Sequence, residues 1–254
     1  MRPVPASPRT LPTTEGIAVR GERFTREGVV TGTGLIMTSA VLLLALHSVA
    51  RADENFEKVG VYLEQTVEDH DVEVRFEATG GDDGLATLSV VAPDGRTVVD
   101  FKAPESKLGI RQVNLETPEP KNNGTLKADF PEGAYRFSGS TVGGLKLHGQ
   151  AKLTHRLPDA TSFVHPRPGE KHLPVTGLEV QWRPVKNLRA WLVVIEDEAS
   201  GSEFRVTLPV TTTAFAVPDG FLAAGTKYTL AIGAVTNEGN TTFTETAFTT
   251  APQK

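Results

Sequence analysis

The stretch from Leu178 to Thr250 decides the fold, and it opens with the segment Leu178-Glu179-Val180-Gln181-Trp182. Apolar and polar residues alternate in this segment, which is typical of a β-strand that buries one face. The stretch continues through Gly225-Thr226-Lys227-Tyr228 into an apolar run that ends at Val235. A Trp on an early strand and a Tyr entering a late one, about 45 residues apart, predict a β-sandwich of immunoglobulin-like size.

Six segments of this stretch have strand character. They alternate or run apolar over lengths that strands prefer, and they comprise residues 178–182, 190–196, 203–208, 214–217, 228–235 and 241–248. No segment after residue 52 has a convincing helical period. We therefore expect this region to be an antiparallel sandwich.

Residues 161–250 resemble a fibronectin type III domain. The resemblance is carried by Trp182, the strand Leu192–Ile195, Leu222 with the following Gly225-Thr226-Lys227-Tyr228, and Ala234–Gly239. It implies that Trp182 lies in the core, and that Leu222 and Tyr228 form a corner in which the Tyr hydroxyl holds the turn backbone. The family implies a fold and an exported location but no activity.

Residues 53–157 contain six or seven short segments of strand character and are expected to form a first antiparallel sandwich. Asp71 to Ala78 alternates without exception, so Glu73, Arg75 and Glu77 are expected to face water. Residues 104–124 are expected to be a long connection around one short strand. The strands predicted here comprise residues 71–78, 85–91, 96–101, 110–115, 134–137 and 145–153.

The approach to the strand at Tyr135, Phe130-Pro131-Glu132-Gly133-Ala134-Tyr135, has the design of Ala224–Tyr228 and indicates two related modules. This region is also similar to the part that precedes the fibronectin type III domain in uncharacterised exported bacterial proteins. The fold class we predict is all-β, with two consecutive antiparallel β-sandwich domains preceded by a helical signal segment. The predicted division is 1–52 signal peptide with a long polar n-region, 53–157 first sandwich, 158–170 linker, 171–250 fibronectin type III-like domain and 251–254 tail.

The N-terminal leader predicts export. Residues 28–50 lack Asp, Glu, Lys and Arg, and Ala40–Leu46 forms an apolar centre that is followed by Ala50-Arg51-Ala52. Arginines before an apolar segment and small residues at its end are typical of a signal peptide, so we expect cleavage after Ala52. The alternative is an uncleaved membrane anchor, which would be the protein's only contact with a membrane. Its dense apolar part is shorter than the ~20 residues that a spanning helix needs.

Composition excludes several classes of protein. The chain has no Cys, which excludes disulfides, thiolate metal sites and a Cys nucleophile. Residues 1–52 hold six of the 26 basic and three of the 31 acidic side chains, so the mature chain has a net charge near −8. A chain this acidic, without a clustered basic face, is a poor ligand for nucleic acid.

The histidines do not form a metal-binding motif. Five of them follow the predicted cleavage site, namely His70, His148, His155, His165 and His172. Zinc ligands must converge on one ion, whereas His148 and His155 are seven residues apart and fall on opposite faces of a regular strand. We expect exposed or linker histidines.

Three groups of polar residues are candidate sites. Asp82 and Asp83, with Asp69 and Asp71 near in sequence, leave calcium binding open, although Asp-Gly is also an ordinary turn. Glu196-Asp197-Glu198 is expected to be a solvated turn rather than the paired acids of a glycoside hydrolase. Asn123 and Asn240 begin glycosylation sequons, which we attribute to chance.

These observations predict no catalytic, cofactor-binding or metal-binding residue, no cofactor and no enzyme. The expected function is a non-catalytic binding or structural module, with an unknown protein or carbohydrate partner, at the cell surface, in the periplasm or outside the cell. The turn Asn237–Asn240 and the loop after Ser200 are possible contact points. One alternative is a carbohydrate-binding accessory module that uses Trp191 as an exposed platform. A further alternative is a hydrolase, which requires a deep pocket with converging carboxylates or histidines.

Overall fold

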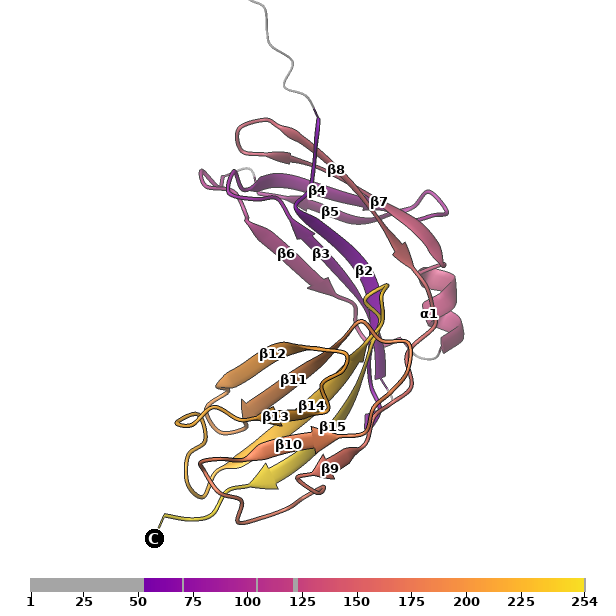
Figure 1. Ribbon diagram of the computed structural model, residues 1–254. Coiled ribbons are helices and arrows are strands. Elements are labelled where there is room, and N and C mark those ends of the chain that lie inside the picture. The colour runs from indigo at the N-terminus through magenta and orange to yellow at the C-terminus, as the bar shows by residue number, and fades with distance from the viewer. Residues whose placement is uncertain (1–52, 70, 104, 121–122, 254) are drawn as a thin grey trace, which may run out of the picture. The chain divides into compact units, whose positions relative to one another are not determined.

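The computed structural model describes residues 53–69, 71–103, 105–120 and 123–253 (Figure 1). The leader and the cleavage site predicted after Ala52 lie outside these residues. Strands dominate the described part, as the sequence predicts, and they form three sheets.

The N-terminal sandwich packs a five-stranded sheet against part of a longer one. In spatial order, the five-stranded sheet consists of β1 (Glu54–Asn55), β8 (Lys146–Leu153), β7 (Gly133–Thr141), β4 (Leu85–Val91) and β5 (Thr97–Lys102). The longer sheet has seven strands and belongs to both sandwiches. It consists of β12 (Glu203–Pro209), β11 (Ala190–Asp197), β14 (Lys227–Val235), β15 (Thr241–Thr249), β2 (Lys58–Thr66), β3 (Asp71–Thr79) and β6 (Gln112–Glu116).

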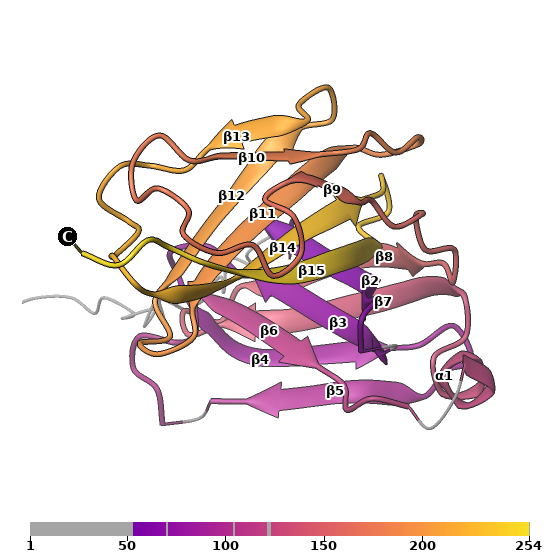
Figure 2. The ribbon, with the colours of Figure 1, turned by 90° about the horizontal axis from the view of Figure 1, so that it is seen from below.

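The C-terminal sandwich is closed by a separate three-stranded sheet. This sheet contains β13 (Ala214–Ala216), β10 (Glu179–Trp182) and β9 (Phe163–His165). Figure 2 shows these strands as a layer over β11, β12, β14 and β15. The C-terminal sandwich therefore has three strands in one sheet and four in the other.

Alternation along the strands builds two main cores. In β3, Val72, Val74, Phe76 and Ala78 are buried while the residues between them face the other side of the sheet. These side chains join those of β2, β4, β7 and β8 in the first core. The second core is built around Trp182 and contains residues of β10, β11 and β14. Each sandwich thus buries its own apolar set.

One pairing joins the two sandwiches edge to edge. Strand β2 runs parallel to β15, with Glu64 opposite Thr241 and Thr66 opposite Phe243. A second parallel pairing, between β1 and β8, lies within the first sandwich. The predicted antiparallel sandwiches are confirmed, and these two short parallel pairings are additions that the sequence does not predict. The alternation of side chains along a strand shows which face of the strand is buried, but it does not show which other strand pairs with it.

Three strands and one helix differ from the sequence-based expectation. The strands β1, β2 and β9 were not predicted, although Val59, Val61 and Leu63 alternate along β2. Strand β9 falls within the residues expected to be a linker. The connection expected over 104–124 overlaps helix α1 (Asn123–Asp129), which buries Leu126 against the first core. Seven residues make fewer than two turns, too few to show a helical period.

Candidate functional site at the junction of the sandwiches

Asn240 fixes the junction at the point where β15 begins. Its side chain is 1% exposed, and its Oδ1 accepts a hydrogen bond from the Leu63 N–H at 2.9 Å. Its Nδ2 donates to the carbonyl oxygens of Thr154 at 2.9 Å and Arg156 at 3.0 Å, with the Thr154 hydroxyl at 3.1 Å. An amide has two N–H donors, so these three acceptors share two hydrogens. One buried side chain thereby ties β2 and the chain that leaves β8 to the second sandwich.

Further hydrogen bonds continue this contact along β15. The Thr242 hydroxyl donates to the Pro158 carbonyl at 2.9 Å, and the Thr244 hydroxyl donates to the Thr161 carbonyl at 3.2 Å. On the other side of the strand, the Glu245 N–H donates to the Glu68 carboxylate at 2.9 Å. The residues that follow β8 are therefore bonded to β15 along much of its length.

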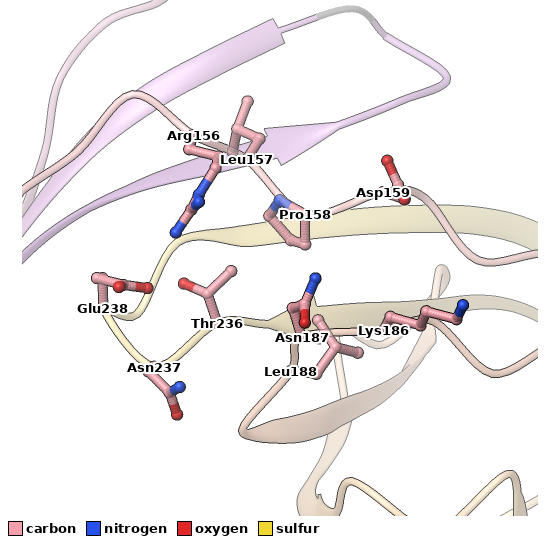
Figure 3. Close-up of a pocket in the computed structure, with 10 residues that line it drawn as sticks. All are labelled: Arg156, Leu157, Pro158, Asp159, Lys186, Asn187, Leu188, Thr236, Asn237 and Glu238. Carbon is pink, nitrogen blue, oxygen red and sulfur yellow. The ribbon is translucent and has the colours of Figure 1, made fainter.

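A hollow of about 600 Å³ lies next to the turn that precedes Asn240 in the chain, where Thr236, Asn237 and Glu238 line it (Figure 3). Three segments line it: Arg156–Asp159 after β8, Lys186–Leu188 before β11, and Thr236–Glu238 after β14. Ligand pockets usually have volumes of about 300–1,000 Å³. The hollow is therefore large enough for a small ligand, and both sandwiches contribute to it.

The charged side chains of the hollow have both signs. Arg156 and Lys186 are cationic, and Asp159 and Glu238 are anionic. Figure 3 shows Arg156 and Glu238 at one end, and Lys186 and Asp159 at the other. Within the described residues, none of these four side chains makes an ion pair or a hydrogen bond. All four are therefore open to interaction with a ligand.

Local backbone geometry shapes two walls of the hollow. Asn187 has a φ of 62°, a left-handed conformation that Asn tolerates better than most residues. The turn after β14 is closed by the Thr236 N–H, which donates to the Asn240 carbonyl at 2.9 Å. Gly239 has a φ of 99°, and a Cβ at this position would lie 3.4 Å from the Tyr62 ring. The Thr236 hydroxyl is buried without a hydrogen-bond partner.

A second hollow of about 320 Å³ lies on the other side of the same turn. Tyr62 and Arg205 line it from the two sandwiches. Burial, together with the charges of Glu77 and Glu64, raises the pKa of Tyr62 to about 12. The Tyr62 hydroxyl therefore keeps its proton to a higher pH than an unperturbed tyrosine does.

Carboxylates gather around Arg75 on the outer face of β2, β3 and β6. The Arg75 guanidinium contacts Glu64 at 2.7 Å and Glu116 at 2.5 Å. Burial raises the pKa of Glu73 to about 7, and the hydrogen bond and charge of Glu116 add to this effect. These outward-facing residues are thus partly covered, although the alternation of β3 predicts that they face water.

The histidines lie apart in the described part of the chain. His148 contacts Asp53 at 3.0 Å on an exposed surface, and His155, beyond the end of β8, contacts the Phe130 carbonyl at 2.8 Å. His165 Nδ1 lies 3.7 Å from Glu170, and His172 is exposed. His70 lies outside the described residues. No group of three or more His, Asp or Glu side chains among the described residues is placed to hold a metal ion.

The acidic residues considered for calcium do not converge. Asp71 begins β3, whereas Asp82 and Asp83 follow its other end. Asp82 is exposed and pairs with Arg111 at 2.9 Å. Asp82 and Asp83 instead border a small hollow with Glu54 and other residues of the N-terminal strand.

Glu196-Asp197-Glu198 forms the end of β11 and the turn after it. Asp197 accepts hydrogen bonds from the N–H groups of Ala199 at 2.9 Å and Ser200 at 3.3 Å, and these bonds lower its pKa. Glu198 bonds Lys227 at 2.8 Å, which lowers the pKa of Glu198. Neither group has the raised pKa that a general acid needs.

Trp191 is fully buried, so it is not the exposed platform that a carbohydrate-binding module requires. Its indole N–H donates to the Val210 carbonyl at 3.0 Å, and its ring meets Trp182 edge-on at 5.7 Å. The exposed large hydrophobic residues in the described part are aliphatic. Of the two Asn residues that begin glycosylation sequons, Asn240 is unsuited to glycosylation because it is buried. Asn123 is the first residue of α1.

A tyrosine corner characterises the second sandwich. The Tyr228 hydroxyl accepts a hydrogen bond from the Ala223 N–H at 2.8 Å, while Leu222 and Trp182 are buried in the core. These are the positions and contacts that the sequence resemblance implies, and they lie in a three-plus-four-stranded sandwich.

The C-terminal sandwich has the fibronectin type III fold.

The solved structures that this chain is similar to include fibronectin type III domains, at low identity and low TM-score. The FN1–FN3 domains of chicken CNTN1 match 76% of this chain and 65% of theirs, just under two thirds, at 14% identity and a TM-score of 0.30. A two-domain fibronectin type III segment of chicken tenascin matches 77% of this chain and 99% of its own length, at 15% identity and a TM-score of 0.31. The fibronectin(III)-like modules of Clostridium thermocellum CbhA match 81% of this chain and 93% of their own length, at 7% identity and a TM-score of 0.32. No protein-family model and no curated protein matches the sequence.

The hollow lies at one end of the fibronectin type III sandwich, where the loops before β11 and after β14 meet the first sandwich. Sequence reasoning indicated the turn Asn237–Asn240 as a possible contact point but missed the other two walls. No helix within the described residues is long and apolar enough to cross a membrane.

Proposed function

We propose that this chain is an exported, non-catalytic binding module that contacts its partner through the hollow at the junction of the two sandwiches. The observation that supports this best is a set of four charged side chains in the hollow that form no ion pair or hydrogen bond within the described residues: Arg156, Lys186, Asp159 and Glu238. Asn240 helps to fix the segments that carry them, through its hydrogen bond to the Arg156 carbonyl. Sandwich folds often bind ligands through loops that a rigid scaffold holds in place. The shared seven-stranded sheet supplies such a scaffold here.

Export is proposed from the leader alone. Its apolar centre and the segment Ala50-Arg51-Ala52 favour cleavage before Asp53. The test is cell fractionation of the full-length protein, followed by intact-mass measurement of each fraction. A mature chain beginning near Asp53 outside the cytoplasm supports export, and a full-length chain confined to the cytoplasm overturns it.

The binding role is tested by capture of partners from the envelope fraction of the source cell. The exported protein is compared with Arg156→Glu/Lys186→Glu and with a matched control, Arg136→Glu/Lys171→Glu. All four residues are exposed, and both pairs replace one Arg and one Lys. We expect the first pair to lose capture and the control to retain it. A wild-type protein that captures nothing specifically would contradict a binding role.

A further inference from the structure

The charge arrangement of the hollow restricts the ligand that fits it. A simple anion would meet Asp159 and Glu238, and a simple cation would meet Arg156 and Lys186. Like charges brought together disfavour binding, whereas complementary charges favour the correct partner. Each wall of the hollow has opposite charges at its two ends: Arg156 and Asp159 on one wall, Glu238 and Lys186 on the other (Figure 3). The best-matched ligand that lies along either wall therefore carries charges of both signs.

The middle of the hollow offers amide and apolar groups. Asn187 and Asn237 each have an exposed side-chain amide, which can both donate and accept a hydrogen bond. Their described side chains make no hydrogen bond within the chain. Leu157, Pro158 and Leu188 line the space between the charged ends. Amide groups match the peptide backbone, and the apolar side chains match a small uncharged side chain.

The walls are fixed before any ligand arrives. Asn240 is bonded to the Arg156 carbonyl, and the turn that carries Asn237 is closed by Thr236 and Asn240. A preformed site loses less conformational entropy on binding than a flexible one. An extended segment of a few residues can therefore bind without extensive reordering of the protein.

We propose that the hollow binds a short extended peptide segment with side chains of opposite charge flanking one or two small or apolar residues. This proposal depends on the binding role above and specifies its ligand. A glycan is a poorer fit because the described surface offers no exposed aromatic platform. A polyanion is a poorer fit because two of the four charged groups are carboxylates.

The test uses the exported protein and a set of acetylated, amidated tetrapeptides. The members are Lys-Ala-Ala-Glu, Glu-Ala-Ala-Lys, Lys-Ala-Ala-Lys, Glu-Ala-Ala-Glu and the neutral Gln-Ala-Ala-Gln, each titrated by two-dimensional NMR. We expect at least one mixed-charge member to bind at least fivefold more tightly than the other three kinds. Its shifted resonances should lie around Asn187, Asn237 and Leu157.

Two variants of the hollow and one control variant make the assignment specific. Arg156→Glu/Lys186→Glu is expected to weaken binding of that peptide at least tenfold, and Arg136→Glu/Lys171→Glu less than twofold. Asn187→Gly keeps a residue suited to a φ of 62° while it removes the amide, so a folding defect is avoided. It is expected to weaken binding at least threefold.

Three results would overturn the proposal: no binding by either mixed-charge peptide, equal binding of the neutral peptide, or resonance shifts away from the hollow. The envelope capture experiment separates this failure from failure of the binding role. Capture of a partner that is unaffected by the hollow variants would leave the binding role intact and remove the peptide assignment.

Discussion

The side-chain oxygen of Asn240 accepts a hydrogen bond from the N–H of Leu63, 177 residues earlier in the chain, at 2.9 Å. Leu63 lies in the middle of β2 in the first sandwich, and Asn240 precedes β15 in the second. Both residues are buried, at 1% exposure each. The contact therefore places a fully bonded amide where two sandwich edges meet. We expect the two cores to unfold together.

Replacing Asn240 tests this coupling. Asn240→Ala leaves the Leu63 N–H and the carbonyls of Thr154 and Arg156 without their partner. An unsatisfied buried polar group costs about 1–3 kcal/mol, so we expect a loss of about 2–4 kcal/mol in the free energy of unfolding, measured with urea. Asn237→Ala, in the same turn but exposed, is the control and is expected to change it by less than about 0.5 kcal/mol. Equal effects of the two substitutions would show that Asn240 does not fix the junction.

Tyr135 and Tyr228 allow a test of whether the two cores, although expected to unfold together, are packed separately. The Tyr135 hydroxyl donates to the Pro131 carbonyl at 3.1 Å, and the Tyr228 hydroxyl accepts from the Ala223 N–H at 2.8 Å. Tyr135→Phe and Tyr228→Phe are each expected to cost about 1 kcal/mol, the usual net value of one hydrogen bond. Their effects should add in the double variant because the rings lie in separate clusters. A deviation from additivity above about 0.5 kcal/mol would contradict separate cores.

The sequence predicts strands better than it predicts the junction. Val74 and Phe76 alternate with Glu73 and Arg75, and this local pattern is sufficient to place β3 and its buried face. Nothing local to Asn240 indicates that it bonds Leu63, because a sequence pattern carries no information on contacts 177 residues apart. The local pattern of polar residues is sufficient to predict that the turn before Asn240 is exposed. The hollow depends on loops that are far apart in the sequence, so the sequence does not predict it.

The carboxylates around Arg75 make stability depend on pH. Burial and Glu116 raise the pKa of Glu73 from 4.5 to about 7 in the folded chain, while Arg75 opposes and Asp71 supports this shift. Glu64 lies directly opposite Glu73 on β2. Between these two pKa values the folded state holds a proton that the unfolded state has lost, so stability falls as the pH rises from about 4.5 to 7.

Glu73→Gln removes that contribution. The midpoint of thermal unfolding of the variant is therefore expected to fall less between pH 5 and pH 8 than that of the parent. A residual fall is expected because burial also raises the pKa of Glu245. Glu54→Gln on the exposed strand β1 is the control and should retain the pH dependence of the parent. Parallel curves for parent and Glu73→Gln would show that Glu73 does not retain its proton in the folded chain.

Trp191 is expected to act through packing alone. Its ring is fully buried against Trp182, and its indole N–H bonds the Val210 carbonyl. Trp191→Ala should lower the free energy of unfolding by about 3–5 kcal/mol, as other large-to-small substitutions of buried aromatic residues do. Leu108→Ala, at a side chain that is 87% exposed, is the control and should stay within about 0.5 kcal/mol of the parent.

The same residue provides an optical test in the folded protein. Both tryptophans are buried, so fluorescence emission should be blue-shifted relative to the unfolded chain and poorly quenched by acrylamide. Addition of oligosaccharides should leave the spectrum unchanged, because no indole face is open for a sugar to stack on. Strong acrylamide quenching, or a saturable change with an oligosaccharide, would place Trp191 at the surface and support the carbohydrate-binding alternative.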